Sequence, residues 1–391
     1  MSPSGRLAPH HRVFAAFAIY AFGLGQIFPR LPDVKLALGI EEGALGLALI
    51  GISVGTITSL TLSTPLIQRI GYRHALLALT PLMSAFMGIA IHADSPLALF
   101  LLLIPVGLCV GAIEVIVNME ADRTEAVMGR RIMNRAHAFW SFGFFGAGLF
   151  GAAMAQLGVP AVWQLGLAAP LVAGLTWACL ADFQPAPRRG SDTQETTPLI
   201  ARPTRAILVL VGVSLSAMLL EGASIDWSAI YMRSVFDAIP LMWGLAVAAP
   251  ALAQALMRYF ADGFVDLYSP VRVARVMQAL MAFGTLTVVL APSAVIGLIG
   301  LACIGAGTSV MFPLAMSAAA QRTDRPAAIN VAAIAQISFV TFLLGPPLLG
   351  YIAEHLGLRW TFGVGLPLVV LSFALAGALG DKPVAETKKA A

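Results

Sequence analysis

Residues 97–119 read LALFLLLIPVGLCVGAIEVIVNM, an apolar run that is interrupted by one carboxylate, Glu114. A run of this length can cross the hydrocarbon core of a bilayer, roughly 30 Å thick, as a single helix. An acidic side chain inside such a helix is costly, and it usually faces the protein interior or a water-filled cavity. The run therefore predicts a membrane span, and Glu114 is its candidate functional residue.

The composition of the whole chain agrees with this run. Apolar residues make up 59% and charged residues 11% of the chain, whereas soluble domains carry about 25% charged residues. This predicts an all-α polytopic membrane protein embedded in a lipid bilayer. The net charge of +4 comes from segments beside the spans, not from a basic tract with aromatics, so we expect no nucleic-acid partner. The three cysteines lie in apolar runs without metal-ligand spacing, so we expect no metal and no cofactor.

Twelve transmembrane helices are predicted from the apolar runs and the hairpins between them. They cover residues 12–32, 44–66, 74–93, 97–119, 135–157, 161–182, 206–232, 239–261, 271–291, 294–318, 327–352 and 358–380. The distribution of basic residues agrees with this map, because 20 of the 24 Lys and Arg then fall on one side. Since basic loops stay in the cytoplasm, we expect a multi-pass protein of a bacterial inner (plasma) membrane with both termini cytoplasmic. The basic residues left outside are Arg30, Lys35, Arg233 and Arg359.

An internal repeat divides the chain into two halves. Residues 123–125 (RTE) recur as 322–324 (RTD), an offset of 199, and the glycines of span five recur in span eleven at the same offset. Parallel repeats of this kind build transporters that bind solute near the midplane between the halves. We expect a six-helix half over 1–183, a cytoplasmic linker over 184–204 and a second six-helix half over 205–391.

Three ionisable side chains are candidates for proton coupling: Glu114, Glu221 and His137. Glu114 and Asn118 are four residues apart and share a helix face. Glu221 stands in an apolar run of the second half, and His137 opens span five near the cytoplasmic end of the expected cavity. For the acids the alternative is a structural carboxylate neutralised by a helix neighbour, and for His137 it is an interfacial contact with loop carbonyls.

Seven polar or aromatic side chains in the spans are candidates for solute binding. They offer hydrogen bonds or a ring face to a solute, although helix packing explains most such residues equally well. They are Tyr20, Gln26, Asn118, Trp140, Trp227, Phe312 and Gln336.

Charges at two hairpins are candidates for a gate on the cytoplasmic face. The turn after span two supplies Arg69 and Arg73, and the segment at the end of span eight supplies Arg258, Asp262 and Asp266. The two aspartates, four residues apart, can cap or bridge neighbouring helices when that face closes. The alternative is an ordinary hairpin whose charges only set the topology. Asp226 is expected in an outer salt bridge, with Arg233 as its partner.

At these residues the chain resembles the major facilitator superfamily, and within it the fucose-permease-like branch and its uncharacterised bacterial relatives. The resemblance rests on residues 111–118 (GAIEVIVN), 134–141 (NRAHAFWS) and 221–228 (EGASIDWS), with 69–73 (RIGYR) and 345–350 (GPPLLG) less specific. It implies the two-half transporter fold and assigns proton coupling to Glu114. The chain departs from the family at Gln68, where an aspartate is usual, and at Gln26, where no span-one acid is present.

These observations together predict a proton-coupled symporter of a small polar, sugar-like solute, working by alternating access and as a monomer. The alternative is a proton-antiport exporter of drugs or metabolites, although span five lacks the Gly-Pro signature expected of exporters. No constellation of catalytic residues and no nucleotide-binding sequence is present, so we expect no enzyme. A channel is disfavoured because there is no filter-like loop.

Overall fold

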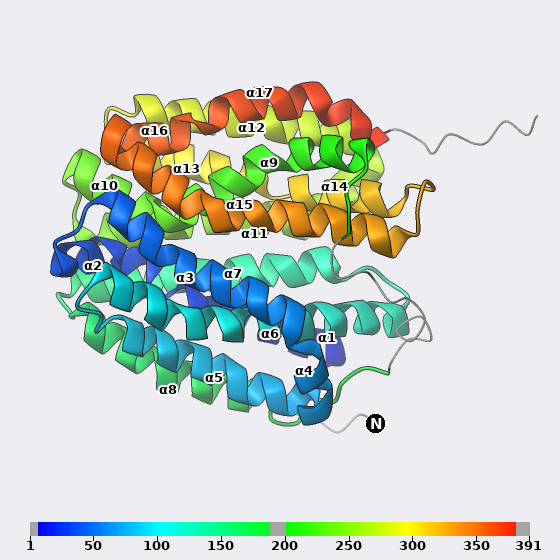
Figure 1. Cartoon of the computed structure of the whole chain (residues 1–391), viewed down its shortest axis with the longest axis horizontal. Coiled ribbons are helices and arrows are strands. Elements are labelled where there is room, and N and C mark those ends of the chain that lie inside the picture. Colours follow the sequence, from blue (N-terminus) through cyan, green and yellow to red (C-terminus); the bar gives the residue numbers. More distant parts are fainter. Residues whose placement is uncertain (1–6, 188–200, 381–391) are drawn as a thin grey trace, which may run out of the picture.

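The computed structural model describes residues 7–187 and 201–380, and these residues form helices joined by short turns, with no strand among them. Twelve helical segments are long and apolar enough to span a membrane (Figure 1), so the predicted all-α polytopic fold is confirmed. The first six spans and their connections are α1 (Pro9–Gly25), η1 (Phe28–Arg30), α2 (Leu31–Leu38), α3 (Glu42–Leu62), α4 (Thr64–Ile70), α5 (Tyr72–Ala90), α6 (Pro96–Met128), α7 (Met133–Gln156) and α8 (Ala161–Leu180). The other six are α9 (Arg205–Asp226), α10 (Ser228–Phe236), α11 (Pro240–Tyr268), α12 (Pro270–Leu290), α13 (Ala294–Thr308), α14 (Met311–Ala320), α15 (Ala327–Leu356), α16 (Leu358–Gly363), α17 (Gly365–Leu375) and η3 (Ala376–Gly380).

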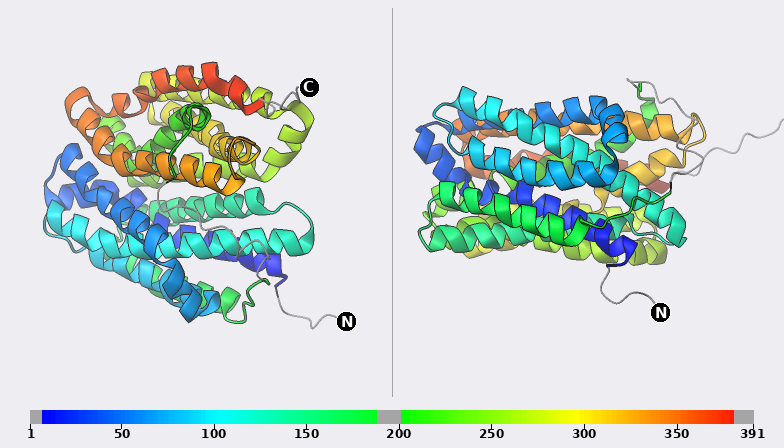
Figure 2. Two further views of the ribbon diagram at one scale, coloured as in Figure 1. Left: turned by 45° about the vertical axis from the view of Figure 1, so that its right-hand side comes forward. Right: turned by 90° about the horizontal axis from the view of Figure 1, so that it is seen from below.

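The helices of the first six spans lie side by side on one half of the molecule, and those of the last six lie on the other (Figures 1 and 2). The start of α1, the end of η3 and the two segments that flank residues 188–200 all lie at one end of the bundle. We call this end the linker side, and the opposite end, where α2, α10 and α16 lie, the far side. Most of the linker predicted over 184–204 falls in residues 188–200, outside the described part of the chain.

Two helices are longer on the linker side than their apolar runs predicted. α6 was expected to end near residue 119, but it continues for more than two turns to Met128. The added residues include good helix formers, and Gly129, at φ 64°, supplies the left-handed conformation that ends the helix. α11 likewise extends past residue 261 and ends at Tyr268. Asp262 and Asp266 therefore lie on a helix, which corrects their expected place in a hairpin turn.

Several spans are interrupted along their length. Span one breaks between α1 and α2, span seven at Trp227 between α9 and α10, and span ten between α13 and α14. Breaks in transporter helices are tolerated where the freed backbone is buried in protein or lines a cavity. The break at Trp227 follows Glu221 by less than two turns, so the second candidate carboxylate lies close to irregular backbone.

The basic residues of the far side bind helix-end carbonyl groups. Arg30 donates to the carbonyl of Val159 at 3.0 Å, and Arg359 donates to the carbonyls of Val289 and Ala291 at 2.8 Å. A cation at the carboxyl end of a helix satisfies free carbonyls and complements the helix dipole. Arg30 and Arg359 thus stabilise helix ends, which explains why these two arginines lie on the side of the protein that has few basic residues.

The two sets of helices approach each other closely on the far side. Gly46 of α3 lies against the carbonyl of Pro346 of α15, and an added Cβ at Gly148 of α7 would come within 2.8 Å of the backbone nitrogen of Ala248. The backbone nitrogen of Gly43 also donates to the Glu354 carboxylate at 3.0 Å. Small residues allow this backbone contact between helices. The far side is therefore closed in this conformation.

Candidate functional site

Glu114 lies midway along α6 and is held by two neutral donors. The hydroxyl of Tyr20, on α1, donates to one carboxylate oxygen at 2.9 Å, and the Asn118 side-chain amide donates to the other at 2.7 Å. Asn118 is one turn away on the same helix face, as its spacing predicted. Tyr20 itself is buried, with 1% of its surface exposed. The described contacts therefore fix the carboxylate by hydrogen bonds from neutral groups.

His137 joins this group from the start of α7. Its Nε2 lies 3.1 Å from Oδ1 of Asn118, and its ring packs against that of Phe17 with centroids 5.1 Å apart. Neutral imidazole can donate or accept at Nε2 depending on its tautomer. Tyr20, Glu114, Asn118 and His137 form one hydrogen-bonded cluster across three spans, which we call the Glu114 cluster. All four members are candidates from the sequence.

Glu221 differs from Glu114 because it is paired with an arginine. Nη2 of Arg258, on α11, lies 3.3 Å from the Glu221 carboxylate, and both side chains are largely buried, with 11% of the arginine and 16% of the glutamate exposed. The same guanidinium donates to the carbonyl of Ser309 at 3.0 Å and to the Ser141 hydroxyl at 3.1 Å. Arg258 was assigned to a gate at the membrane surface. The structure corrects that assignment, because Arg258 lies inside the bundle as the partner of Glu221.

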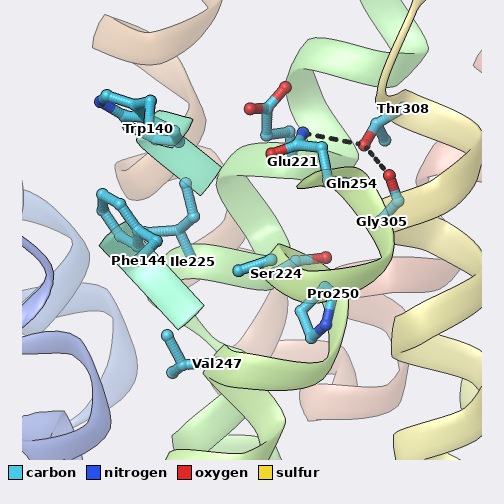
Figure 3. A pocket seen from close by; sticks show the side chains of 11 residues that line it. Trp140, Phe144, Glu221, Ser224, Ile225, Val247, Pro250, Gln254, Gly305 and Thr308 are labelled. Carbon is cyan, nitrogen blue, oxygen red and sulfur yellow. Dashed lines mark hydrogen bonds between the residues drawn. The ribbon is translucent and has the colours of Figure 1, made fainter. Parts of the chain in front are cut away.

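A second chain of polar groups connects the two sets of helices. Ser141 of α7 donates to the side-chain oxygen of Gln254 on α11 at 2.9 Å, and Gln254 donates to Thr308 at 3.4 Å (Figure 3). Since Ser141 is also bonded to Arg258 and lies one turn from His137, it stands between the Glu114 cluster and the Glu221–Arg258 pair. We call Glu221, Arg258, Ser141, Gln254 and Thr308 the Glu221 cluster.

A small cavity adjoins the Glu221 cluster. Trp140 and Phe144 of α7 form one wall, their rings tilted with centroids 4.5 Å apart. Glu221, Gln254 and Thr308 lie on the facing side (Figure 3). Its volume is about 20 Å³, enough for about one water molecule. Spans five, seven, eight and ten line it.

Several predicted solute ligands lie elsewhere. Gln26 is buried against α8, where it accepts from Gln164 at 3.2 Å and donates to the Phe22 carbonyl, so it packs helices. Trp227 is completely buried and packs where an added Cβ at Gly350 would touch its ring. Both corrections have one cause, since a polar or aromatic residue in a span packs against neighbouring helices as readily as it lines a cavity.

The other two candidates of the second half are less enclosed. The exposed side chain of Gln336 accepts a hydrogen bond from the backbone nitrogen of Ala201 at 3.0 Å, at the linker side and not in the cavity of Figure 3. Phe312 is half-buried on α14 and is likewise absent from that cavity. The expected salt bridge of Asp226 is also wrong, because Arg233 donates instead to the carbonyl of Pro32 at 2.7 Å.

The predicted gate residues separate into two kinds. Asp262 of α11 accepts a short hydrogen bond from Asn134 of α7, which joins the two sets of helices on the linker side. Asp266 and Arg69 are exposed, and Arg73 is half-buried. Among the described contacts, Asp262 thus bridges the halves on the linker side, and Arg258 bridges them deeper in the bundle through Ser141.

Sequence reasoning missed Ser141, Gln254 and Thr308. A serine, an amide and a threonine in apolar spans are individually unremarkable, since hydroxyls often bond their own helix backbone. One signal was present, because Gln254 and Arg258 are four residues apart and so share a face of α11. Nothing in the sequence paired that face with Ser141 of span five.

Comparison with known proteins agrees with this architecture. The family model described as Major Facilitator Superfamily matches residues 209–391. An uncharacterized MFS-type transporter of Yersinia pestis is 27% identical over 93% of this chain and 94% of its own length. An uncharacterized transporter of Sinorhizobium fredii is 28% identical over 91% of this chain and 94% of its own length.

The second half of the chain thus matches the major facilitator superfamily, and nearly the whole chain is similar to a transporter of that superfamily. Solved structures show the same fold at low identity. The nucleoside transporter NupG superposes with a TM-score of 0.73 at 12% identity, covering 95% of this chain and all of its own. The fucose:proton symporter FucP of Escherichia coli superposes with a TM-score of 0.67 at 15% identity, covering 96% of this chain and 99% of its own. This transporter is a multi-pass membrane protein and not an enzyme.

Proposed function

We propose that this transporter is a proton-coupled symporter of a small polar, sugar-like solute, working by alternating access as a monomer. The observation that carries the proposal is Glu114, a partly buried carboxylate whose described hydrogen-bond donors are the neutral groups of Tyr20 and Asn118. A carboxylate held by neutral donors can gain a proton without leaving a buried cation unpaired. It can therefore load and release a proton in each cycle.

Apolar surroundings favour the protonated form of a carboxyl group, and Glu114 is flanked by Ile113 and Val115 in an apolar helix. The neighbouring His137 lies on the linker side of Glu114, and its ring nitrogens can donate or accept a proton. A route from Glu114 to His137, through water that enters beside Asn118 when the halves separate, would then deliver the proton to the linker side. Glu221 would sense the solute and hold Arg258, whose guanidinium donates to Ser141 of the first half.

The solute class follows from the walls of the cavity in Figure 3. One wall offers the ring faces of Trp140 and Phe144, and the facing wall offers carboxylate, amide and hydroxyl groups. A pyranose or furanose presents apolar C–H groups on one face and hydroxyl groups at its edge, which matches this division. The printed names of FucP and NupG, a fucose symporter and a nucleoside transporter, agree with such solutes.

The cavity is too small for a sugar in this conformation, so binding requires the halves to separate. We propose that 1–183 and 205–391 move as the two halves, and that Asp262 with Asn134 forms the linker-side gate. Arg69, Arg73 and Asp266 would contribute charge to the same face. The basic residues of the linker side support a cytoplasmic position for it in a bacterial inner membrane.

The decisive experiment measures solute-dependent pH change in proteoliposomes across sugars, sugar acids, nucleosides, amino acids and drugs. A symporter alkalinises the compartment from which solute is taken, whereas an antiporter acidifies it. Alkalinisation by a sugar-like solute, absent in empty liposomes, is the expected result. Acidification would favour the exporter, and solute flux without any pH change would refute proton coupling.

Orientation can be tested separately with single cysteines in a variant that lacks the native three. Ala126 of α6 is exposed on the linker side, and Leu157, 76% exposed, follows α7 on the far side. In intact cells a membrane-impermeant reagent should label Leu157→Cys and spare Ala126→Cys. The reverse pattern would invert the proposed orientation.

A further inference from the structure

The surface between α11 and α12 carries a groove that the transport cycle does not use. It lies on the linker side, where the end of one helix meets the start of the next, and its volume is about 560 Å³. Phe264 and Tyr268 of α11 and Val276 of α12 are 42%, 51% and 61% exposed along it. This volume suits part of an acyl chain, and the groove lies on a surface of helices that span the membrane.

Two arginines make this groove different from ordinary lipid-facing surface. Arg272 and Arg275 lie three residues apart on α12, so they occupy one helix face, and both are exposed and line the groove. The guanidinium of Arg275 lies over the ring of Phe373, 5.8 Å from its centroid. Stacking of this kind leaves the N–H edge of a guanidinium free for an anion.

The charge of these arginines is not neutralised by an ion pair among the described residues. The salt bridges of residues 7–187 and 201–380 include neither Arg272 nor Arg275. Asp266, the acid nearest to them along the chain, is exposed and is not in those salt bridges, and Asp262 is engaged by Asn134. An anion from outside the described residues can therefore bind at these arginines.

The repeat shows that the feature belongs to the second half alone. At the offset of 199, Phe264 corresponds to Pro65, and Arg275 corresponds to Leu76. The corresponding hairpin carries two arginines of its own, Arg69 and Arg73, but it has no aromatic residue at the position of Phe264 and no arginine at the position of Arg275. The combination of an aromatic wall with Arg275 is therefore particular to the second half.

We propose that this groove binds one anionic phospholipid of the linker-side leaflet. Its phosphate would lie between Arg272 and Arg275, and one acyl chain would lie along Phe264, Tyr268 and Val276. Arginine pairs suit phosphate because the guanidinium donates two parallel hydrogen bonds, and basic pockets between spans bind acidic headgroups. The site is separate from the Glu114 and Glu221 clusters. Lipid binding there therefore does not depend on which solute is transported.

The test is lipid retention by the purified transporter, measured by native mass spectrometry. The protein is supplied with equal amounts of phosphatidylglycerol and phosphatidylcholine that have identical acyl chains. We expect one phosphatidylglycerol to be retained preferentially, and we expect Arg272→Gln with Arg275→Gln to lower that preference about tenfold. Arg69→Gln, at an exposed arginine of the matching hairpin, should leave it unchanged.

A lysine variant and a competition with inorganic phosphate test the proposal further. Replacing both arginines by lysine keeps the charge and should keep most of the preference, which separates lipid binding from misfolding of the glutamine variant. Inorganic phosphate at millimolar concentration should not displace the lipid, because it lacks the acyl chain. Equal retention of both lipids, an unchanged preference in the glutamine variant, or displacement by phosphate would each overturn the proposal.

Discussion

The two carboxylates of the central spans are alike in sequence and different in surroundings. Glu114 accepts hydrogen bonds from Tyr20 and Asn118, whereas Glu221 lies 3.3 Å from Arg258. An arginine stays charged at all physiological pH values, so Glu221 has a permanent cation as its neighbour in this conformation. A carboxylate with neutral neighbours has no such restraint. From this comparison we propose that Glu114 exchanges the proton and that Glu221 acts as the partner of Arg258.

The largest effect is expected from Glu114→Gln. Glutamine keeps the shape and can still bond with Tyr20, but it cannot carry the proton, so solute binding and exchange should persist while proton-driven accumulation is lost. Uptake against a gradient and counterflow exchange in proteoliposomes measure the two activities. Glu120→Gln is the matched control, because Glu120 also lies on α6 and is buried. Accumulation at the wild-type rate and pH dependence in Glu114→Gln would make Glu114 structural.

The next effect concerns the ion pair. Arg258→Gln should leave Glu221 buried without its cation and cost about 3 kcal/mol of stability, because breaking a largely buried pair strands one charge. Glu221→Gln should cost less, and the double variant should recover part of the loss. Thermal unfolding of all four proteins gives the coupling energy. Additive effects on the unfolding temperature would show that the two side chains do not interact. In transport assays, Glu221→Gln should reduce solute accumulation less than Glu114→Gln does.

Tyr20→Phe is expected to act more weakly and only on the first cluster. It removes one hydrogen-bond donor to the ionised Glu114, and such a bond is worth about 1–2 kcal/mol. The ionised carboxylate is then less stable relative to the protonated form, so the pH profile of transport should move to higher pH. Tyr231→Phe is the control, since the Tyr231 hydroxyl donates at 2.7 Å to the carbonyl of Val288. It should lower stability without moving the profile. A profile unchanged by Tyr20→Phe would mean that Glu114 does not set it.

The smallest effect should come from Ser141→Ala, which removes the hydroxyl between the clusters. We expect a loss of about 1 kcal/mol in stability and a few-fold lower transport rate, since Arg258 and Gln254 each lose a partner. Ser224→Ala is matched to it, because the Ser224 hydroxyl lies beside the same cavity but bonds the carbonyl of Leu220 on its own helix. If Ser141→Ala and Ser224→Ala changed stability and transport rate equally, Ser141 would have no role beyond that of an ordinary serine beside the cavity.

The sequence predicted the twelve spans and the shared helix face of Glu114 and Asn118 because both depend on local patterns. An apolar run fixes a span, and a four-residue spacing puts Glu114 beside Asn118 on one helix face. The pairing of Glu221 with Arg258 could not be predicted, because it depends on how spans seven and eight rotate against each other. Gln26 and Trp227 were misplaced for the same reason, since helix packing decides which face meets a cavity.

The extra length of α6 has a mechanical consequence. At 1.5 Å per residue, Val127 lies about 20 Å along the helix axis from Glu114, and it is 66% exposed. A slight tilt of α6 near Glu114 would therefore move the end of the helix by a larger distance, outside the hydrocarbon. A spin label at Val127 can be paired with a second label on the other half of the protein. Protonation of Glu114 would then be observed as a change in the distance between the two labels.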